Sequence, residues 1–184
     1  MMAERWTIRF GGFGGQGIVL SSVVFGLAAV HDGKYVCQRA SYGSEARGGK
    51  CKSEVIISDE EISYPLIDDL QVLVVMSQQA IDSYLDELRS GGTLFIDPDM
   101  VDEVHRDDVR VIRIPAAMKA DSLGNRIVAN MVMLGALRAE TGAVSKESLH
   151  KAMRESVADS FVDINTRALE AGENLITELK RGEG

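Results

Sequence analysis

Short apolar runs separated by glycine-rich or polar segments fill the first part of the chain. Residues 6–10 (WTIRF) have the aromatic and branched side chains of a strand and meet glycines at once. Residues 18–30 are almost entirely apolar and predict a helix, with Gly33 as its stop signal. Residues 34–40 (KYVCQRA) and 51–58 (CKSEVIIS) have the pattern of two further strands. The glycine-rich segment between them predicts a hairpin.

Strands and helices continue to alternate as far as residue 114. Residues 71–76 (QVLVVM) are continuously apolar at their centre, which is typical of a strand covered on both faces of a parallel sheet. Residues 78–89 predict a helix that ends at Gly91 and Gly92. The segments TLFID and VRVIRI predict two more strands. The alternation predicts an α/β fold with a doubly wound, Rossmann-like, mostly parallel sheet and an added β-hairpin.

Beyond Pro115 the pattern is helical only. Residues 125–141 (NRIVANMVMLGALRAET) are apolar on nearly every face of the projected helix, so we expect them in the core or under a partner subunit. Leu149, Met153, Val157 and Phe161 recur every four residues and predict one amphipathic helix. Residues 166–184 predict a last helix. We expect a single domain over residues 1–184, closed by these C-terminal helices.

Charge and composition narrow the class of protein. The 184 residues are 45% hydrophobic and 26% charged, without the long apolar run of a membrane span, and the first residues lack the pattern of a signal peptide. A cytoplasmic protein with no membrane partner is therefore expected. The net charge of -8 would repel a phosphate backbone, so no nucleic-acid partner is expected. A small cationic group, Arg39, Arg47, Lys50 and Lys52, suits one anionic ligand.

The glycine segment at residues 12–17, GFGGQG, has the GxGxxG spacing of a dinucleotide-binding loop between a strand and a helix. The first turn of that helix would present free backbone N–H groups to an anion. A NAD site also needs an acid at the end of the second strand, where this chain has Cys37, Gln38 and Arg39. The nearest acid, Asp32, comes before that strand. Dinucleotide binding and a purely structural turn both stay open.

A second polar segment, SYGSEARGGK at residues 41–50, carries a hydroxyl, a phenol, a carboxylate and a guanidinium among glycines. It predicts either a binding loop or an exposed hairpin turn. The two cysteines, Cys37 and Cys51, cannot hold a four-cysteine cluster, and the three histidines stand outside any acid–base constellation.

Four motifs taken together resemble the gamma subunit, or gamma domain, of the 2-oxoacid:ferredoxin oxidoreductases. They are GFGGQG at 12–17, SYGSEARGGKCKSEVIIS at 41–58, VLVVMSQQA at 72–80 and NMVMLGAL at 130–137, and they span nearly the whole chain. Ser44 departs from the proline common in the family. The EARGG segment, the stretch DEEISYP at 59–65 and the length of the chain look most like the 2-oxoglutarate enzymes.

The resemblance implies a part in the CoA-dependent oxidative decarboxylation of a 2-oxoacid, with 2-oxoglutarate as the expected substrate, to acyl-CoA, CO2 and reduced ferredoxin. It places thiamine diphosphate, magnesium and iron–sulfur (4Fe–4S) clusters on partner subunits, named alpha, beta and a ferredoxin-like delta, and leaves this chain without catalytic or metal-binding residues. Coenzyme A is a candidate ligand. A NAD(P)-binding oxidoreductase and a purely architectural subunit are the alternatives. The candidate contact residues for CoA or a neighbouring subunit are Gly12, Phe13, Gly14, Gly15, Gln16, Gly17, Ser41, Tyr42, Glu45, Arg47, Gly48 and Gly49.

Overall fold

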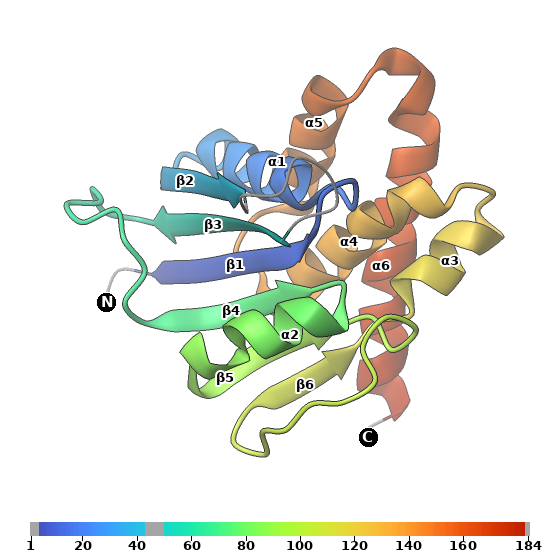
Figure 1. Cartoon of the computed structure of the whole chain (residues 1–184). Helices are drawn as coiled ribbons and strands as arrows, with labels where there is room; N and C mark the ends of the chain where they lie inside the picture. Colours follow the sequence, from blue (N-terminus) through green and yellow to red (C-terminus); the bar gives the residue numbers. More distant parts are fainter. Residues whose placement is uncertain (1–3, 43–49, 183–184) are drawn as a thin grey trace.

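Six strands form one mixed sheet in the order β2-β3-β1-β4-β5-β6 (Figure 1). The computed structural model describes residues 4–42 and 50–182. Strands β1, β4, β5 and β6 run parallel, while β3 is antiparallel to both of its neighbours. The predicted fold, a Rossmann-like, mostly parallel sheet with an added hairpin, is confirmed. The strands are β1 (Arg5–Phe13), β2 (Tyr35–Tyr42), β3 (Lys50–Ser58), β4 (Leu70–Val75), β5 (Leu88–Ile96) and β6 (Arg110–Arg113).

Helices lie on both faces of this sheet, most of them on one (Figure 1). Figure 1 shows α2 on one face and α1 with α4, α5 and α6 on the other. The helices are α1 (Ile18–His31), α2 (Gln78–Tyr84), α3 (Ala116–Ser122), α4 (Ala129–Thr141), α5 (Lys146–Ser156) and α6 (Val162–Gly182), and the 3-10 turns are η1 (Leu85–Glu87), η2 (Arg126–Val128) and η3 (Asp159–Phe161).

The side chains of β1 alternate between two cores, as the pleat of a strand requires. Ile8 and Phe10 are buried in the large core with α1, α4 and α6. Arg9 points to the opposite face, where it is also buried. Its guanidinium forms ion pairs with Glu54 on β3 (2.6 Å) and Glu87 on η1 (2.7 Å). This buried cation is held by two carboxylates, which fasten η1 to the sheet.

Helices α4 and α6 cross in direct backbone contact at two glycines. A Cβ on Gly172 would collide with the carbonyl oxygen of Val132 and lie 2.8 Å from the backbone nitrogen of Ala136. Gly135 has the same relation to the Leu169 carbonyl. The all-round apolar character of α4 is therefore explained by burial between the sheet and α6, which selects the domain-core interpretation over an interface.

The predicted helix over residues 78–89 is too long. Helix α2 ends at Tyr84, and the chain becomes a strand at Leu88, which pairs with Leu70 of β4. Gly91 and Gly92 lie within β5 and do not end a helix. Leu85 and Leu88 are both buried, at the three-residue spacing of a helix face, but Leu88 is buried as part of the sheet. A buried leucine at this position fits a helix as well as a strand, so the apolar pattern could not show where the helix ends.

The four-residue recurrence from Leu149 to Phe161 also spans a break. Helix α5 ends at Ser156, and Val157 is extended with φ -119° and ψ 156°. Phe161 then belongs to η3, from which α6 starts earlier than predicted. The prediction of one helix was wrong because the apolar spacing continues across a turn in which Asp159 and Ser160 favour a new start.

Candidate functional site at the carboxyl edge of the sheet

The glycine segment begins inside a strand. Strand β1 runs through Phe13, so Gly12 and Phe13 are ladder residues paired with Cys51 and Lys50 of β3, and the loop is shorter than predicted. The turn that follows uses left-handed backbone at Gly15 (φ 100°) and Gly17 (φ 72°), where glycine is favoured. Helix α1 then starts at Ile18, and no side chain caps its first turn. The predicted tight turn into a helix N-terminus is confirmed.

Gln16 holds this turn in place with its side-chain amide. The Oε1 atom accepts a hydrogen bond from the Phe13 backbone N–H (2.8 Å), and Nε2 donates to the carbonyl of Met76 (2.8 Å). Met76 directly follows β4, so one side chain joins the carboxyl ends of β1 and β4. The Gln16 amide is engaged within the chain, which leaves Gly14 and Gly15, both exposed, as the outward part of the loop.

Gly17 is packed against Asn130, the second residue of α4. A Cβ at position 17 would overlap the Asn130 Nδ2 atom, which lies 3.5 Å from the Gly17 carbonyl oxygen. Asn130 is only 5% exposed and is a residue that the sequence analysis left out of the site. Its signal in the sequence was an asparagine at the start of an otherwise apolar helix.

The sheet register brings the second motif to the same edge. Gly12 pairs with Cys51, and Cys51 pairs with Tyr42, so the ends of β1 and β2 lie level on either side of the start of β3. Ser41 is exposed at the end of β2. Glu45, Arg47, Gly48 and Gly49 lie outside the described residues. The backbone positions that flank them, 42 and 50, stand beside the glycine turn.

Two adjoining cavities open beside the turn, with Gly15, Ile127 and Asn130 lining both. The first has a volume of about 260 Å³ and lies between the loop, Met76 and Met100, with Arg126 as its charged lining residue. The second has a volume of about 370 Å³ and lies toward η3. Both are at the carboxyl edge, the end of the sheet where ligands of open α/β proteins bind.

Asp97 shapes the wall of the first cavity from inside the protein. It follows β5 and is fully buried, and burial raises the pKa of its carboxyl group. Its oxygens accept hydrogen bonds from the backbone N–H groups of Ala117 (2.7 Å) and Asp99 (3.0 Å). The carboxylate thereby fixes the turn after β5 and the start of α3, which carry two of the lining residues, Met100 and Ala117.

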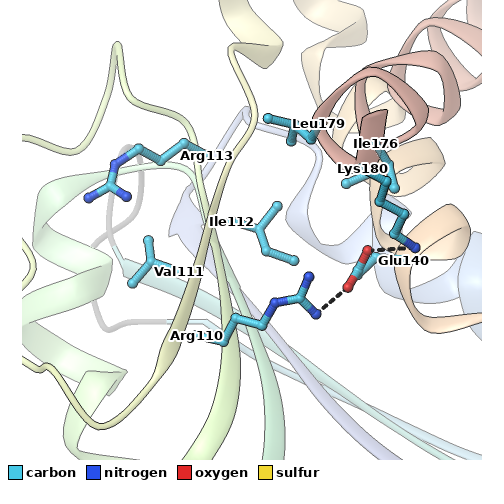
Figure 2. Close-up of a pocket in the computed structure, with 8 residues that line it drawn as sticks. All are labelled: Arg110, Val111, Ile112, Arg113, Glu140, Ile176, Leu179 and Lys180. Atoms are coloured by element: carbon cyan, nitrogen blue, oxygen red, sulfur yellow. Dashed lines mark hydrogen bonds and ion pairs between the residues drawn. The ribbon is translucent and has the colours of Figure 1, made fainter. Parts of the chain in front are cut away.

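A third cavity, of about 230 Å³, lies beside the edge strand β6 (Figure 2). In Figure 2 the Glu140 carboxylate bridges Arg110 and Lys180, the latter at 3.0 Å. The bridge joins β6, α4 and α6, so these charges are used in holding elements together. Within residues 4–42 and 50–182, no residue of the predicted site lines this cavity.

The described residues contain no group of three or more His, Cys, Asp or Glu side chains placed to hold a metal ion. None of their helices is long and apolar enough to cross a membrane.

The topology differs from a dinucleotide fold at the position that binds ribose. In that fold the second strand lies beside the first and ends in an acid. Here antiparallel β3 occupies the place beside β1, and β2 lies one strand further out. Asp32 is also engaged elsewhere: its carboxylate accepts hydrogen bonds from the backbone N–H (2.6 Å) and hydroxyl (2.7 Å) of Ser145. The described residues therefore lack the ribose-binding part of a NAD site.

The fold and the site together define a Rossmann-like α/β protein with a glycine turn and adjoining cavities at the carboxyl edge of its sheet. Comparison with known proteins identifies the family within this structural class. The family model for pyruvate ferredoxin/flavodoxin oxidoreductase matches residues 7–175. The chain belongs to this family.

Three relatives describe its place there. The 2-oxoglutarate synthase subunit KorC of Methanothermobacter marburgensis is 47% identical over 182 residues, which cover 95% of this chain and 98% of KorC. A crystal structure of the keto/oxoacid ferredoxin oxidoreductase gamma subunit from Geobacter sulfurreducens is 39% identical, covers 94% of this chain and 99% of its own, and superposes with a TM-score of 0.84.

The third relative is longer than this chain. The ketoisovalerate oxidoreductase subunit VorA of Methanothermobacter marburgensis is 33% identical over 180 residues, which are 96% of this chain but 37% of VorA. The resemblance to gamma subunits that the sequence motifs predicted is confirmed by these matches.

Proposed function

We propose that this chain is the gamma subunit of a 2-oxoglutarate:ferredoxin oxidoreductase, an enzyme that converts the 2-oxoacid and coenzyme A to acyl-CoA, CO2 and reduced ferredoxin. The observation that carries the proposal is the near full-length match to KorC at 47% identity. Alpha, beta and ferredoxin-like delta subunits would complete the enzyme. Thiamine diphosphate with its magnesium and the iron–sulfur clusters would be held by those partners.

Within this enzyme we assign the carboxyl edge a supporting role in binding coenzyme A and the neighbouring subunit. Three features support the assignment. The first turn of α1 is uncapped by side chains and carries no acid, so its N–H groups favour an anion. The exposed Gly14 and Gly15 allow close approach to the backbone. Arg126 is a cation on the wall of the adjacent cavity.

Arg47 is the residue of the second motif proposed to pair with an anionic group. Its guanidinium can donate two parallel hydrogen bonds to a phosphate or carboxylate. In the reconstituted enzyme, Arg47→Ala is expected to raise the KM for coenzyme A about tenfold, which corresponds to losing one hydrogen bond to a charged group. Arg89→Ala, at the opposite end of the sheet, is the control. If Arg47→Ala changed neither the KM for coenzyme A nor the assembly of the complex, the role proposed for Arg47 would be wrong.

The proposal is tested by co-expression of the chain with the thiamine-containing subunits of its own organism. We expect a stable complex that reduces ferredoxin only when 2-oxoglutarate and coenzyme A are both present, and that loses activity when this chain is omitted. Pyruvate, a branched-chain 2-oxoacid and indolepyruvate serve as competing substrates. A complex that is fully assembled and active without this chain would contradict the proposal.

A purely architectural role is the competing interpretation of the same edge. Gly15→Ala separates the two, because Gly15 has a left-handed backbone but no atom lies within 4 Å of the position that an added Cβ would take. If the edge contacts coenzyme A, the variant raises the KM of the assembled enzyme. If the edge serves packing alone, the variant changes the yield of complex and leaves the turnover of each assembled enzyme unchanged.

A further inference from the structure

The segment between β3 and β4, residues 59–69, projects from the end of the sheet opposite the glycine turn (Figure 1). It carries two large apolar side chains that face solvent, Tyr64 at 55% exposed and Leu66 at 40% exposed. A third, Tyr35 at the start of β2, is 52% exposed. Clusters of exposed apolar side chains mark binding surfaces, and tyrosine is enriched where proteins bind one another.

Tyr35 lies beside the projecting segment. It pairs with Ser58, the residue that precedes the segment. Its side chain points to the same face of the sheet as that of Cys37, because alternate residues of a strand share a face. The Cys37 sulfur is 4.0 Å from the Pro65 carbonyl oxygen, which places the segment against this face of β2. The resulting surface, here named the tyrosine patch, consists of Tyr35, Tyr64, Pro65 and Leu66.

The segment that carries the patch is fastened to the sheet and the core. At its start, the Asp59 backbone N–H donates to the Glu4 carbonyl (3.1 Å). The next N–H, of Glu60, donates to the Ser58 hydroxyl (3.1 Å). Near its end, Ile67 packs against the smaller core cluster, to which α2 contributes. A segment fixed in this way loses little conformational freedom when a partner binds, which lowers the entropic cost of association.

The rim of the tyrosine patch is acidic. Residues 59–69 contain five acidic side chains and no lysine, arginine or histidine. Asp59 lies 3.7 Å from the Lys34 amine, and Asp69 lies 3.0 Å from the Arg89 guanidinium. The other three are exposed and take part in no ion pair among the described residues: Glu60, Glu61 and Asp68. A surface that binds here is therefore favoured if it brings positive charge.

This charge restricts the class of partner. A nucleic acid or an anionic membrane surface would be repelled by the rim. A second copy bound through the same patch would place acid against acid, because a two-fold interface brings identical surfaces together. Resting on the proposed function, we infer that the tyrosine patch docks another subunit of the enzyme, at a surface where lysine and arginine side chains surround an apolar contact. This contact is at the end of the sheet opposite the proposed coenzyme A site.

The apolar part of the contact is tested by association of this chain with the co-expressed thiamine-containing and ferredoxin-like subunits, followed by surface plasmon resonance. Tyr64→Ala is expected to weaken binding at least about tenfold, as for an aromatic residue at the centre of an interface. Leu179→Ala is the matched control, because Leu179 is 44% exposed and lines the cavity beside β6, at the other edge of the sheet from β2. It should bind as the wild type does. Circular dichroism melts confirm that both variants fold.

The charged part of the contact is tested by the double variant Glu60→Lys, Glu61→Lys. It is expected to slow association severalfold at low ionic strength, and the difference should vanish near about 1 M salt, where the screening length is about 3 Å. Glu170→Lys, Glu178→Lys, at two exposed positions of α6, changes the net charge equally and should have a much smaller effect. In the wild-type complex a carbodiimide, which joins a carboxylate to a lysine amine in contact with it, should link Glu60 or Glu61 to a partner subunit.

The outcomes separate this inference from the proposed function. If the wild-type chain joins the complex and both Tyr64→Ala and the Glu60, Glu61 double variant join it equally well, the inference is wrong and the proposed function stands. If Tyr64→Ala abolishes self-association of the isolated chain while the complex forms normally, the patch binds a second copy and the inference is again wrong. If the wild-type chain itself fails to associate with the other subunits, the proposed function fails first.

Discussion

At the scale of single residues, most of the glycine segment has a structural role: it connects β1, the end of β4 and α1, and only a small part of it is free to bind a ligand or partner. Gln16 satisfies a backbone donor of β1 and a backbone acceptor after β4, and Gly17 leaves room for Asn130. The glutamine that precedes the last glycine of the motif is thus explained by an internal hydrogen-bonding role. The loop that remains for a partner or ligand is Gly14 and Gly15.

Gln16→Ala should destabilise the chain by about 1–3 kcal/mol, because two backbone groups lose their hydrogen-bonding partner. The free energy of unfolding in urea is the measurement. Gln79→Ala is the matched control, since Gln79 is exposed on α2 and its removal should change stability by less than about 0.5 kcal/mol. Equal stability of the two variants would mean that water replaces the Gln16 amide without cost.

At the scale of elements, the end of α1 is tied to the start of α5 by one carboxylate. Burial alone would raise the pKa of Asp32, but hydrogen bonds from Ser148 and Ser145 outweigh it and lower the pKa below its ordinary value of 3.8. Ser145 is also the N-cap of α5, and its hydroxyl accepts from the Ser148 N–H. The carboxylate therefore orients the cap that begins the helix.

The lowered pKa of Asp32 fixes the direction of a pH effect. A carboxyl group with a depressed folded-state pKa stabilises the fold above its unfolded-state pKa, and this stabilisation is lost as pH falls through the folded-state value. At pH 7 Asp32→Asn should be less stable than the wild type by about 1–2 kcal/mol. The difference should shrink below about pH 4. Urea unfolding at several pH values measures it, and a difference independent of pH would contradict the ionic role.

The crossing of α4 and α6 makes a second prediction for elements. Gly172→Ala should cost about 3 kcal/mol, because the added methyl group meets backbone atoms that cannot move without separating the helices. Gly182→Ala, at the end of α6 with open space around it, should stay within about 0.5 kcal/mol of the wild type. Thermal unfolding of the two variants compares them. A small effect at Gly172 would show that the crossing is loose.

At the scale of the whole molecule, the strand order argues against the binding of a dinucleotide. Inserting antiparallel β3 beside β1 removes the strand whose terminal acid would bind ribose, while leaving the turn and the helix N-terminus intact. The same insertion brings the second motif level with the first at the carboxyl edge. One change in topology thus explains both the incomplete NAD pattern and the close placement of the two motifs.

The isolated chain is accordingly expected to show no saturable heat when titrated with NAD(H) or NADP(H). A known dinucleotide-binding protein in the same buffer confirms that the calorimeter would detect binding. A tight, saturable heat with either nucleotide would support the alternative of a stand-alone NAD(P)-binding oxidoreductase and would contradict the subunit assignment.

Much of this architecture was readable from local patterns. Apolar runs located β1, α1, β4 and the buried α4, and the glycine spacing identified the turn into α1, because these features depend on neighbours within a few residues. Four ordered motifs were enough to predict the family. The failures were at Leu88 and Val157, where apolar spacing persisted through a change of structure and burial could be satisfied by a sheet or a turn as well as by a helix.

The sequence by itself determined the order of the six strands and of the helices other than α3, the apolar residues of the core and the family, since each follows from composition and short-range spacing. Only the tertiary structure decided which strand lies beside β1, that Gln16 faces inward and that Asn130 packs on Gly17. It alone also brought Tyr35 to the same patch as Tyr64 and Leu66. These relations join residues that are distant along the chain, and the packing of the sheet against its helices sets them, which no local pattern encodes.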